Sequence, residues 1–192
     1  MAIDLYNRLV DNDLSREDLL ENIIVCNVNR NDIAKIIEIL SKSFGMGGEY
    51  EAFFQIVNSN MDLDNSVKAI DKRDGKIYGL LMFAHYDVVD GSPLRMLNPT
   101  FCTYLSQYSQ INGHSFIIDE RLRGTGLDKK MLYYNTDFLK SGDFIWCGVE
   151  KSLRTLSYWH KLGFVEMCKI PDATFLILPL NEDIKFDLRY YL

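Results

Sequence analysis

The stretch "FIIDERLRGTGLDKKML" (residues 116–132) decides how the fold of this chain is interpreted. An apolar run ends at Asp119, glycines follow at Gly124 and Gly126, and apolar residues then recur at helical spacing. The pattern predicts a strand, a glycine turn and a helix. Such a turn leaves backbone N–H groups without partners beside a helix N-terminus, where an anion can bind, and Arg123 adds a positive charge. Two glycines before a helix are also typical of an ordinary turn, so the stretch alone leaves both interpretations open.

The composition is that of one globular domain with a full hydrophobic core. The chain has 192 residues, of which 47% are hydrophobic and 25% are charged. A net charge of −6, without any run of more than two adjacent basic residues, argues against a nucleic-acid partner. The four cysteines show no CxxC or Cys/His spacing, which predicts reduced core thiols and no metal site.

The sequence contains no targeting or membrane signal that we recognise. The N-terminus "MAIDLYNRLVDND" has no basic region followed by an apolar one, so we expect no signal peptide. No apolar run approaches the roughly 20 residues that cross a bilayer. We therefore expect a cytoplasmic protein without a membrane partner.

Strand and helix patterns alternate along the chain. Residues 1–22 predict one or two helices. Strands are expected at 22–28, in a hairpin spanning 65–89 around the turn "KRDG", and at 113–120, 143–149, 164–170 and 173–180. Helices are expected at 29–45, 47–61, from Pro99 to about Tyr108, 125–142 and 152–163. Helices between strands favour parallel pairing and hairpins favour antiparallel pairing, so the order predicts an α/β fold with a mixed sheet.

Two of the predicted helices have clear ends and faces. Asn29 and Asp32 form a cap for the helix at 29–45, and Gly45 ends it. Its expected buried face is Ile33, Ile36, Ile37, Leu40 and Phe44. The helix at 125–142 is expected to bury Leu127, Met131, Tyr134 and Phe138.

Two motifs together resemble one family. The segment Arg123-Gly124-Thr125-Gly126-Leu127 is similar to the cofactor motif of the GNAT superfamily of N-acetyltransferases, Arg/Gln-x-x-Gly-x-Gly/Ala after the fourth strand. The segment "SLRTLSYWHKLGF" (152–164) resembles that family's helix ending in Tyr-x-x-x-Gly-Phe. The resemblance covers about residues 22–180. It implies a mixed, mostly antiparallel twisted sheet of about seven strands flanked by helices, in a domain of residues 22–192 preceded by an N-terminal helical extension, residues 1–22.

The resemblance also implies a cofactor and its contacts. The co-substrate would be acetyl-CoA, with its pyrophosphate on the backbone N–H groups of residues 124–129 and its pantetheine arm beside Ile118. The cofactor-binding candidates are therefore Ile118, Arg123, Gly124, Thr125, Gly126, Leu127, Asp128 and Lys129. A dinucleotide site is excluded because the GxGxxG spacing is absent, and a Walker loop because no GxxxxGK[ST] occurs.

The sequence departs from the family pattern at two positions. Asp128 replaces the second small residue, where its carboxylate could repel the pyrophosphate or point outward as a first-turn acid. A second register, Arg121-x-x-Gly124-x-Gly126, fits the pattern fully but shifts the helix by two residues, and "KKML" favours the first. Trp159 stands where the family's acidic Tyr is expected, and Tyr158 beside it is rotated by about 100° around the helix.

The expected chemistry is direct attack of an amine on the thioester, which needs a general base or a water chain to remove the proton of the amine. Glu150, at the end of a strand, and His114 are the candidate bases, and Tyr158 is the candidate acid. Cys147 lies in the apolar strand "FIWCGV" and is interpreted as a core residue rather than a nucleophile. His85 and His160 lack companions that would suggest a metal.

Three functions follow from these patterns. The first is an acyl-CoA-dependent N-acetyltransferase acting on the primary amine of a small molecule or peptide. The second is a CoA-binding sensor or scaffold without turnover, which Asp128 and Trp159 suggest. The third is an interaction protein that forms a homodimer, which the aromatic C-terminal tail suggests. The aromatic residues of 90–112 could line the acceptor pocket or pack on a second subunit.

Overall fold

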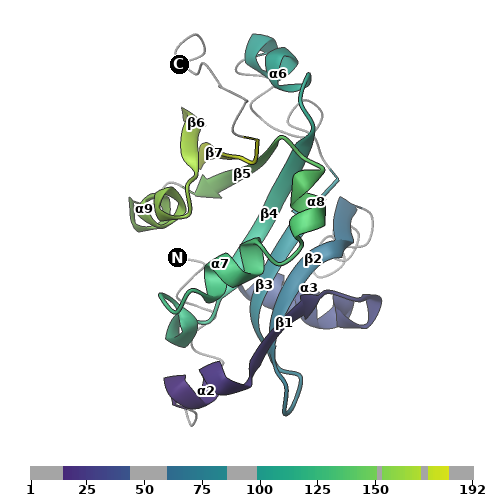
Figure 1. Ribbon diagram of the computed structural model, residues 1–192, viewed down its shortest axis with the longest axis vertical. Coiled ribbons are helices and arrows are strands. Elements are labelled where there is room, and N and C mark those ends of the chain that lie inside the picture. Colours follow the sequence, from purple (N-terminus) through teal and green to yellow (C-terminus); the bar gives the residue numbers. More distant parts are fainter. Residues whose placement is uncertain (1–14, 44–59, 86–98, 151–152, 170–172, 182–192) are drawn as a thin grey trace. The chain divides into compact units, whose positions relative to one another are not determined.

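The computed structural model describes residues 15–43, 60–85, 99–150, 153–169 and 173–181 (Figure 1). The expected helix at 47–61 and the aromatic tail lie almost entirely outside these residues, as do residues 1–14 and 90–98. None of the helices within the described ranges is long and apolar enough to cross a bilayer.

The described strands form one mixed, mostly antiparallel sheet. In chain order they are β1 (Ile23–Asn27), β2 (Met61–Asp71), β3 (Ile77–Ala84), β4 (Gln110–Ile118), β5 (Phe144–Glu150), β6 (Val165–Lys169) and β7 (Ala173–Pro179). Their spatial order is β1-β2-β3-β4-β5-β7-β6. β4 and β5 are paired in parallel, whereas the pairs β1–β2, β5–β7 and β6–β7 are antiparallel. The seven-stranded sheet expected from the sequence is confirmed.

The helices follow the predicted order, with one correction. They are α2 (Arg16–Asn22), α3 (Ile33–Ser43), α6 (Pro99–Leu105), α7 (Leu127–Leu132), α8 (Thr136–Lys140) and α9 (Leu153–Lys161), with 3-10 turns η2 (Arg30–Asp32) and η3 (Glu120–Leu122). The single helix expected at 125–142 is two short helices. The backbone leaves the helix at Tyr133, and Tyr134, expected in the core, is 41% exposed. Apolar spacing alone therefore overestimated the length of this helix.

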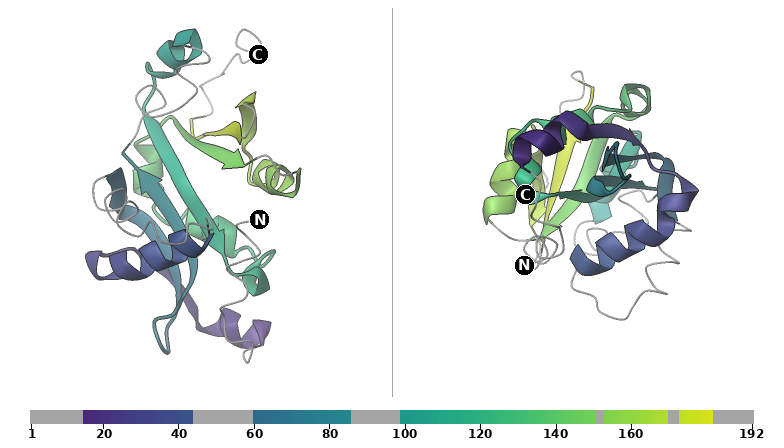
Figure 2. Two further views of the ribbon diagram at one scale, coloured as in Figure 1. Left: turned by 180° about the vertical axis from the view of Figure 1, so that it is seen from behind. Right: turned by 90° about the horizontal axis from the view of Figure 1, so that it is seen from below.

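The chain divides into two compact units, residues 1–83 with 115–134, and residues 84–114 with 135–192. In the first unit, Figures 1 and 2 show α3 on one face of the strands and α7 on the other. A Cβ at Gly79 of β3 would lie 2.8 Å from the Met131 sulfur, so the glycine lets α7 pack closely against β3. In α3 the buried apolar residues are Ile36, Ile37, Ile39 and Leu40, whereas Ile33 is half-buried.

In the second unit, buried residues of α6 pack with residues of β5, β6 and β7. One core cluster joins Cys102, Leu105, Phe144, Trp146, Met167, Phe175 and Ile177. Tyr108 follows α6 and packs its ring against Phe144, with ring centroids 6.5 Å apart. Pro99 is the first residue of α6, where its missing N–H costs nothing, as the sequence predicts.

Local sequence signals position the remaining turns of the first unit. The Asn29 side chain accepts from the amide of Asn31, and Asp32 Oδ2 accepts from the amide of Asn29, 2.8 Å away, which closes the predicted cap. The "KRDG" turn ends at Gly75, whose φ of 73° is left-handed and whose amide donates to the Asp71 carbonyl over 2.8 Å.

A buried ion pair joins η2 to the sheet and provides a stability test. Lys68 Nζ lies 2.6 Å from Asp32 Oδ2, and the two side chains are 8% and 17% exposed. Asp32→Asn leaves the Lys68 ammonium buried without its counter-charge, so we expect the free energy of unfolding to fall by about 3 kcal/mol. Urea denaturation measures it.

The matched control is Asp64→Asn, which neutralises an exposed carboxylate on β2 and should change stability by less than about 0.5 kcal/mol. Adding Lys68→Met to Asp32→Asn should recover part of the loss, because the buried charge is then removed. Equal stability of the Asp32→Asn and Asp64→Asn proteins would contradict this account of the pair.

Candidate functional site

β4 ends at a turn organised by a buried carboxylate. The amide of Asp119 donates to the Tyr78 carbonyl over 2.8 Å, and Asp119 Oδ1 accepts from the Arg121 amide, 3.0 Å away. The Asp119 side chain is 2% exposed, and its charge is paired with the Arg121 guanidinium at 3.0 Å. That guanidinium also lies 5.6 Å from the centroid of the Tyr78 ring. Arg121 therefore belongs to the support of the turn.

The two glycines of the turn are required by backbone conformation. Gly124 has φ of 72° and Gly126 has φ of 84°, both in the left-handed region, and a Cβ at either would meet no atom of the described residues within 4 Å. Between them, Thr125 Oγ1 donates to the Leu122 carbonyl over 2.7 Å and accepts weakly from the Leu127 amide. The turn is thus closed by its own side chain and open on its outer surface.

Four backbone N–H groups of this turn are available to a ligand. Among the described residues, the amides of Gly124, Thr125, Gly126 and Asp128 have no hydrogen-bond acceptor. The first ordinary helical bond into the turn is Lys130 N–H to the Gly126 carbonyl, 3.0 Å. Three consecutive unpaired amides and a fourth two residues further on are suited to bind an anion. The helix begins at Leu127, directly after the second glycine.

The Asp128 side chain accepts a hydrogen bond from one of the backbone amides that were expected to bind the cofactor. Its Oδ1 accepts from the Lys129 amide at 2.8 Å, and the side chain is half-buried. The carboxylate therefore behaves as an acid in the first turn of α7, bonded to the backbone. It also keeps a negative charge next to the four unpaired amides, where it would oppose a bound anion.

The other cofactor candidates lie directly beside the turn. Ile118 is the last residue of β4 and is half-buried. The Arg123 side chain is exposed and its Nε donates to the Ile118 carbonyl over a long 3.4 Å. The eight cofactor candidates thus form one connected stretch from the end of β4 into α7, within the first unit.

An arginine from a distant part of the sequence also reaches this turn. Arg16 Nη2, on α2, donates to the Arg123 carbonyl over 3.2 Å across a separation of 107 residues. No motif marks Arg16, and its contact depends on tertiary structure, so no local pattern could have identified it.

His114 lies in the second unit, just beyond the part of β4 that pairs with β5. The parallel ladder between β4 and β5 joins Gln110–Asn112 to Phe144–Trp146 and ends there. Burial lowers the pKa of His114 below the ordinary value for histidine. The imidazole is therefore neutral at neutral pH, which is the state that a general base needs.

β5 carries two candidate residues, Glu150 and Cys147. Glu150 is the last residue of β5 and pairs with Ala173 of β7, and its side chain is outside the described part of the structure. Cys147 is 3% exposed, and burial raises the pKa of its thiol. A thiol that is buried and protonated is a poor nucleophile, which agrees with its interpretation as a core residue.

The two aromatic residues on α9 are packed together. The Tyr158 and Trp159 rings are 5.7 Å apart, and the Trp159 ring meets Phe164 edge-on at 4.9 Å. The helix ends at Lys161, and the turn that follows it contains Gly163, whose φ is 96°. Trp159 and Tyr158 are both half-buried, and Tyr158 carries the hydroxyl that Trp159 lacks.

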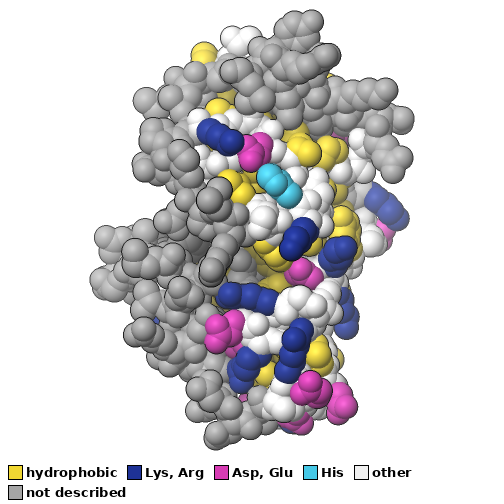
Figure 3. All heavy atoms as spheres, turned by 90° about the vertical axis from the view of Figure 1, so that its left-hand side faces the viewer, with side chains coloured by type: hydrophobic (Ala, Val, Ile, Leu, Met, Phe, Trp, Pro, Cys, Tyr) yellow, Lys and Arg dark blue, Asp and Glu magenta, His cyan; other side chains and the backbone are white. Residues whose placement is uncertain are grey.

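Figure 3 shows both signs of charge on the face that it draws. Lys and Arg side chains lie mostly in the lower half of the coloured surface, with Asp and Glu side chains among and below them. Within the described ranges, no group of three or more His, Cys, Asp or Glu side chains lies close enough to hold a metal ion.

Sequence comparison alone finds no relative: no family model matches the chain, and no curated protein matches it. Solved structures with the same fold do match. The NatC complex bound to Gag peptide and CoA contains a chain that is 18% identical, with a TM-score of 0.58, over 83% of this chain and 99% of that one.

Two bacterial enzymes match to a similar extent. The ribosomal-protein-S18-alanine N-acetyltransferase of Escherichia coli is 14% identical, with a TM-score of 0.55, over 85% of this chain and 99% of its own. A GNAT-family acetyltransferase of Listeria monocytogenes is 15% identical, with a TM-score of 0.54, over 82% and 94%. The seven-stranded mixed sheet, its strand order and these matches give the chain the fold of the GNAT acetyltransferases.

Proposed function

We propose that the protein is an acyl-CoA-dependent N-acetyltransferase that moves an acetyl group from acetyl-CoA to a primary amine. The observation that carries the proposal is the set of four unpaired amides at Gly124, Thr125, Gly126 and Asp128, at the end of β4 in a GNAT fold. These donors suit the pyrophosphate of CoA. Titration calorimetry with acetyl-CoA tests the proposal, and no heat at millimolar cofactor would reject it.

The proposed reaction is a direct transfer. The neutral amine nitrogen attacks the thioester carbonyl carbon, the C–N bond forms and the C–S bond breaks. The proton lost by the amine passes to the base, and the CoA thiolate takes a proton from the acid or from water, since a thiol pKa near 8.5 makes it a tolerable leaving group. Cys147 takes no part because its thiol is buried.

Three residues of the second unit are proposed for the proton transfers. His114 is the first candidate base because burial keeps its imidazole neutral. Glu150 at the end of β5 is the second. Tyr158 is the candidate acid because the neighbouring Trp159 has no acidic proton to give and packs on Phe164.

The acceptor is proposed to be the primary amine of a small molecule or a peptide. The NatC structure holds a peptide and CoA, and the Escherichia coli enzyme is named for an alanine of a ribosomal protein. These neighbours support a peptide acceptor. A homodimer and a cytoplasmic location stay predictions from the sequence.

A binding protein without turnover is the second candidate. Trp159 replaces the expected acid and is packed edge-on against Phe164, and Asp128 keeps a negative charge beside the unpaired amides. Binding of acetyl-CoA without release of free thiol across a panel of primary amines would favour this candidate over the enzyme.

Neutralising Asp128 should tighten CoA binding. In Asp128→Asn the carboxylate is gone while an oxygen that can accept from the Lys129 amide remains. We expect the dissociation constant for CoA to fall about fivefold, because about 1 kcal/mol of repulsion at a partly exposed site is removed. Calorimetry measures it. Asp137→Asn, a first-turn acid of α8 that is 97% exposed, is the matched control and should leave the affinity unchanged.

The pH profile should report the lowered pKa of His114. Proton loss from the imidazole activates a base, so kcat/KM should rise with pH and reach half its plateau below about pH 6.5. His114→Gln should lower kcat/KM about 100-fold and abolish that acidic limb. His85→Gln changes an exposed histidine of the same unit and should keep both the wild-type kcat/KM and the acidic limb of the pH profile. A full rate and an unchanged limb in His114→Gln would assign the base to Glu150 instead.

A further inference from the structure

Arg16 connects α2 to the glycine turn. No sequence motif predicts this contact. Its Nη2 donates to the carbonyl oxygen of Arg123 over 3.2 Å, and α2 contacts η3, the turn that precedes Arg123. The inference below rests on the proposed CoA site, and it concerns how the donors of that site are oriented.

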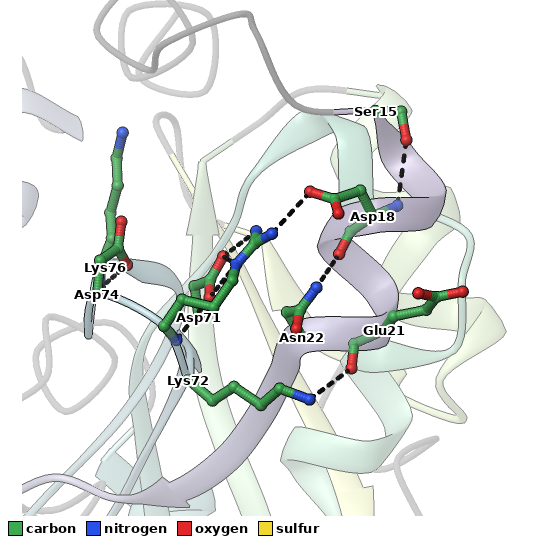
Figure 4. A network of polar contacts seen from close by, with 9 residues as sticks. Ser15, Asp18, Glu21, Asn22, Asp71, Lys72, Asp74 and Lys76 are labelled. Atoms are coloured by element: carbon green, nitrogen blue, oxygen red, sulfur yellow. Dashed lines mark hydrogen bonds and ion pairs between the residues drawn. The ribbon is translucent and has the colours of Figure 1, made fainter.

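The position of α2 is fixed without the help of Arg16. Leu19 is fully buried, and Ser15 caps the helix by accepting from the Asp18 amide. Figure 4 shows the contacts of α2 with the β2–β3 turn. Asp18 Oδ2 lies 2.9 Å from Arg73 Nη1, and the Lys72 amide donates to the Asn22 carbonyl over 3.0 Å.

The β2–β3 turn that contacts α2 is itself held by hydrogen bonds between Asp71 and Arg73. The Asp71 side chain is 1% exposed and accepts from Nε of Arg73 at 2.9 Å, and hydrogen bonds from Arg73 lower the pKa of this carboxyl. Arg73 therefore links a buried carboxylate of the sheet to Asp18 of α2. Because α2 is held in place by contacts that do not involve Arg16, the Arg16 side chain can support the glycine turn from a fixed position.

The hydrogen bond from Arg16 determines the direction of a neighbouring amide. The carbonyl of Arg123 and the N–H of Gly124 belong to one planar trans peptide unit, and in such a unit they point in opposite directions. With its oxygen held by Arg16, this peptide directs the Gly124 N–H away from Arg16. The Gly124 N–H is one of the four amides without an acceptor among the described residues.

Glycine alone does not select this orientation. Rotating the Arg123–Gly124 peptide by about half a turn reverses the sign of φ at Gly124, which is 72° in the structure. Type I and type II turns differ by a rotation of this kind, and glycine tolerates either sign of φ at little cost. An external hydrogen bond is therefore needed to hold one orientation, and Arg16 is the described residue that provides it.

We propose that Arg16 is a positioning residue for the CoA pyrophosphate, which holds the Arg123–Gly124 peptide with its N–H toward the anion. The test compares the wild-type protein with Arg16→Met, using acetyl-CoA and S-acetylpantetheine, which carries the same thioester and lacks the pyrophosphate. We expect Arg16→Met to weaken acetyl-CoA about tenfold in calorimetry, which corresponds to one hydrogen bond to a charged group, and to leave S-acetylpantetheine unchanged.

Two further variants separate geometry from charge and from folding. Arg16→Lys keeps a cationic donor and should recover most of the affinity for acetyl-CoA. Arg30→Met removes an exposed arginine from η2 of the same unit and should bind like the wild type. The ratio of wild-type to Arg16→Met affinity should stay constant between about 0.05 M and about 0.5 M salt, because screening weakens a charge effect and spares a geometric one.

Each other outcome has a defined meaning. Wild-type affinity for acetyl-CoA in Arg16→Met overturns the inference, and so does a ratio that falls to one at high salt. Equal loss of both ligands also overturns it, because the role of Arg16 would then be general support of the fold. A wild-type protein that binds neither ligand instead overturns the proposed function, and the inference falls with it.

Discussion

The buried carboxylate of Asp119 is the constraint on which the candidate site depends. It lies where β4 stops, with 2% of its side chain exposed, and it is bonded both to the Arg121 guanidinium and to the Arg121 amide. A charge buried this deeply must be compensated, because leaving it unpaired costs several kcal/mol. Meeting that requirement turns the chain into η3 directly after the strand. The glycine turn therefore begins at a fixed point relative to β3, which Asp119 also contacts through its amide.

Features encoded in neighbouring residues were predictable from the sequence, and long-range contacts were not. The cap at Asn29, the turn at Gly75, the start of α6 at Pro99 and the glycine turn each depend on residues within a few positions of one another. The break between α7 and α8 was missed because apolar spacing continues across it. The contact of Arg16 with the turn depends on how α2 is docked, which no local pattern encodes.

Trp159 and Asp128, the two departures from the GNAT motifs, have different physical consequences. Trp159 replaces a hydroxyl by an indole that packs on Phe164, so it removes a proton donor and adds apolar contact. Asp128 leaves the backbone geometry of the turn intact and changes only its electrostatics, since its carboxylate accepts from the Lys129 amide. The first departure concerns the chemical step, and the second concerns binding. For the proposed function, binding and turnover are therefore expected to respond to separate substitutions.

Preorganisation explains why a turn with open amides needs so many supports. Three side chains brace it from different directions: Asp119 at its start, Thr125 across its middle and Arg16 from another helix. Free N–H groups gain most from a bound anion when the backbone that carries them is already ordered, because ordering at the moment of binding costs affinity. Left-handed glycines make the geometry accessible and also make it easy to lose. The bracing side chains compensate for the freedom that the glycines introduce.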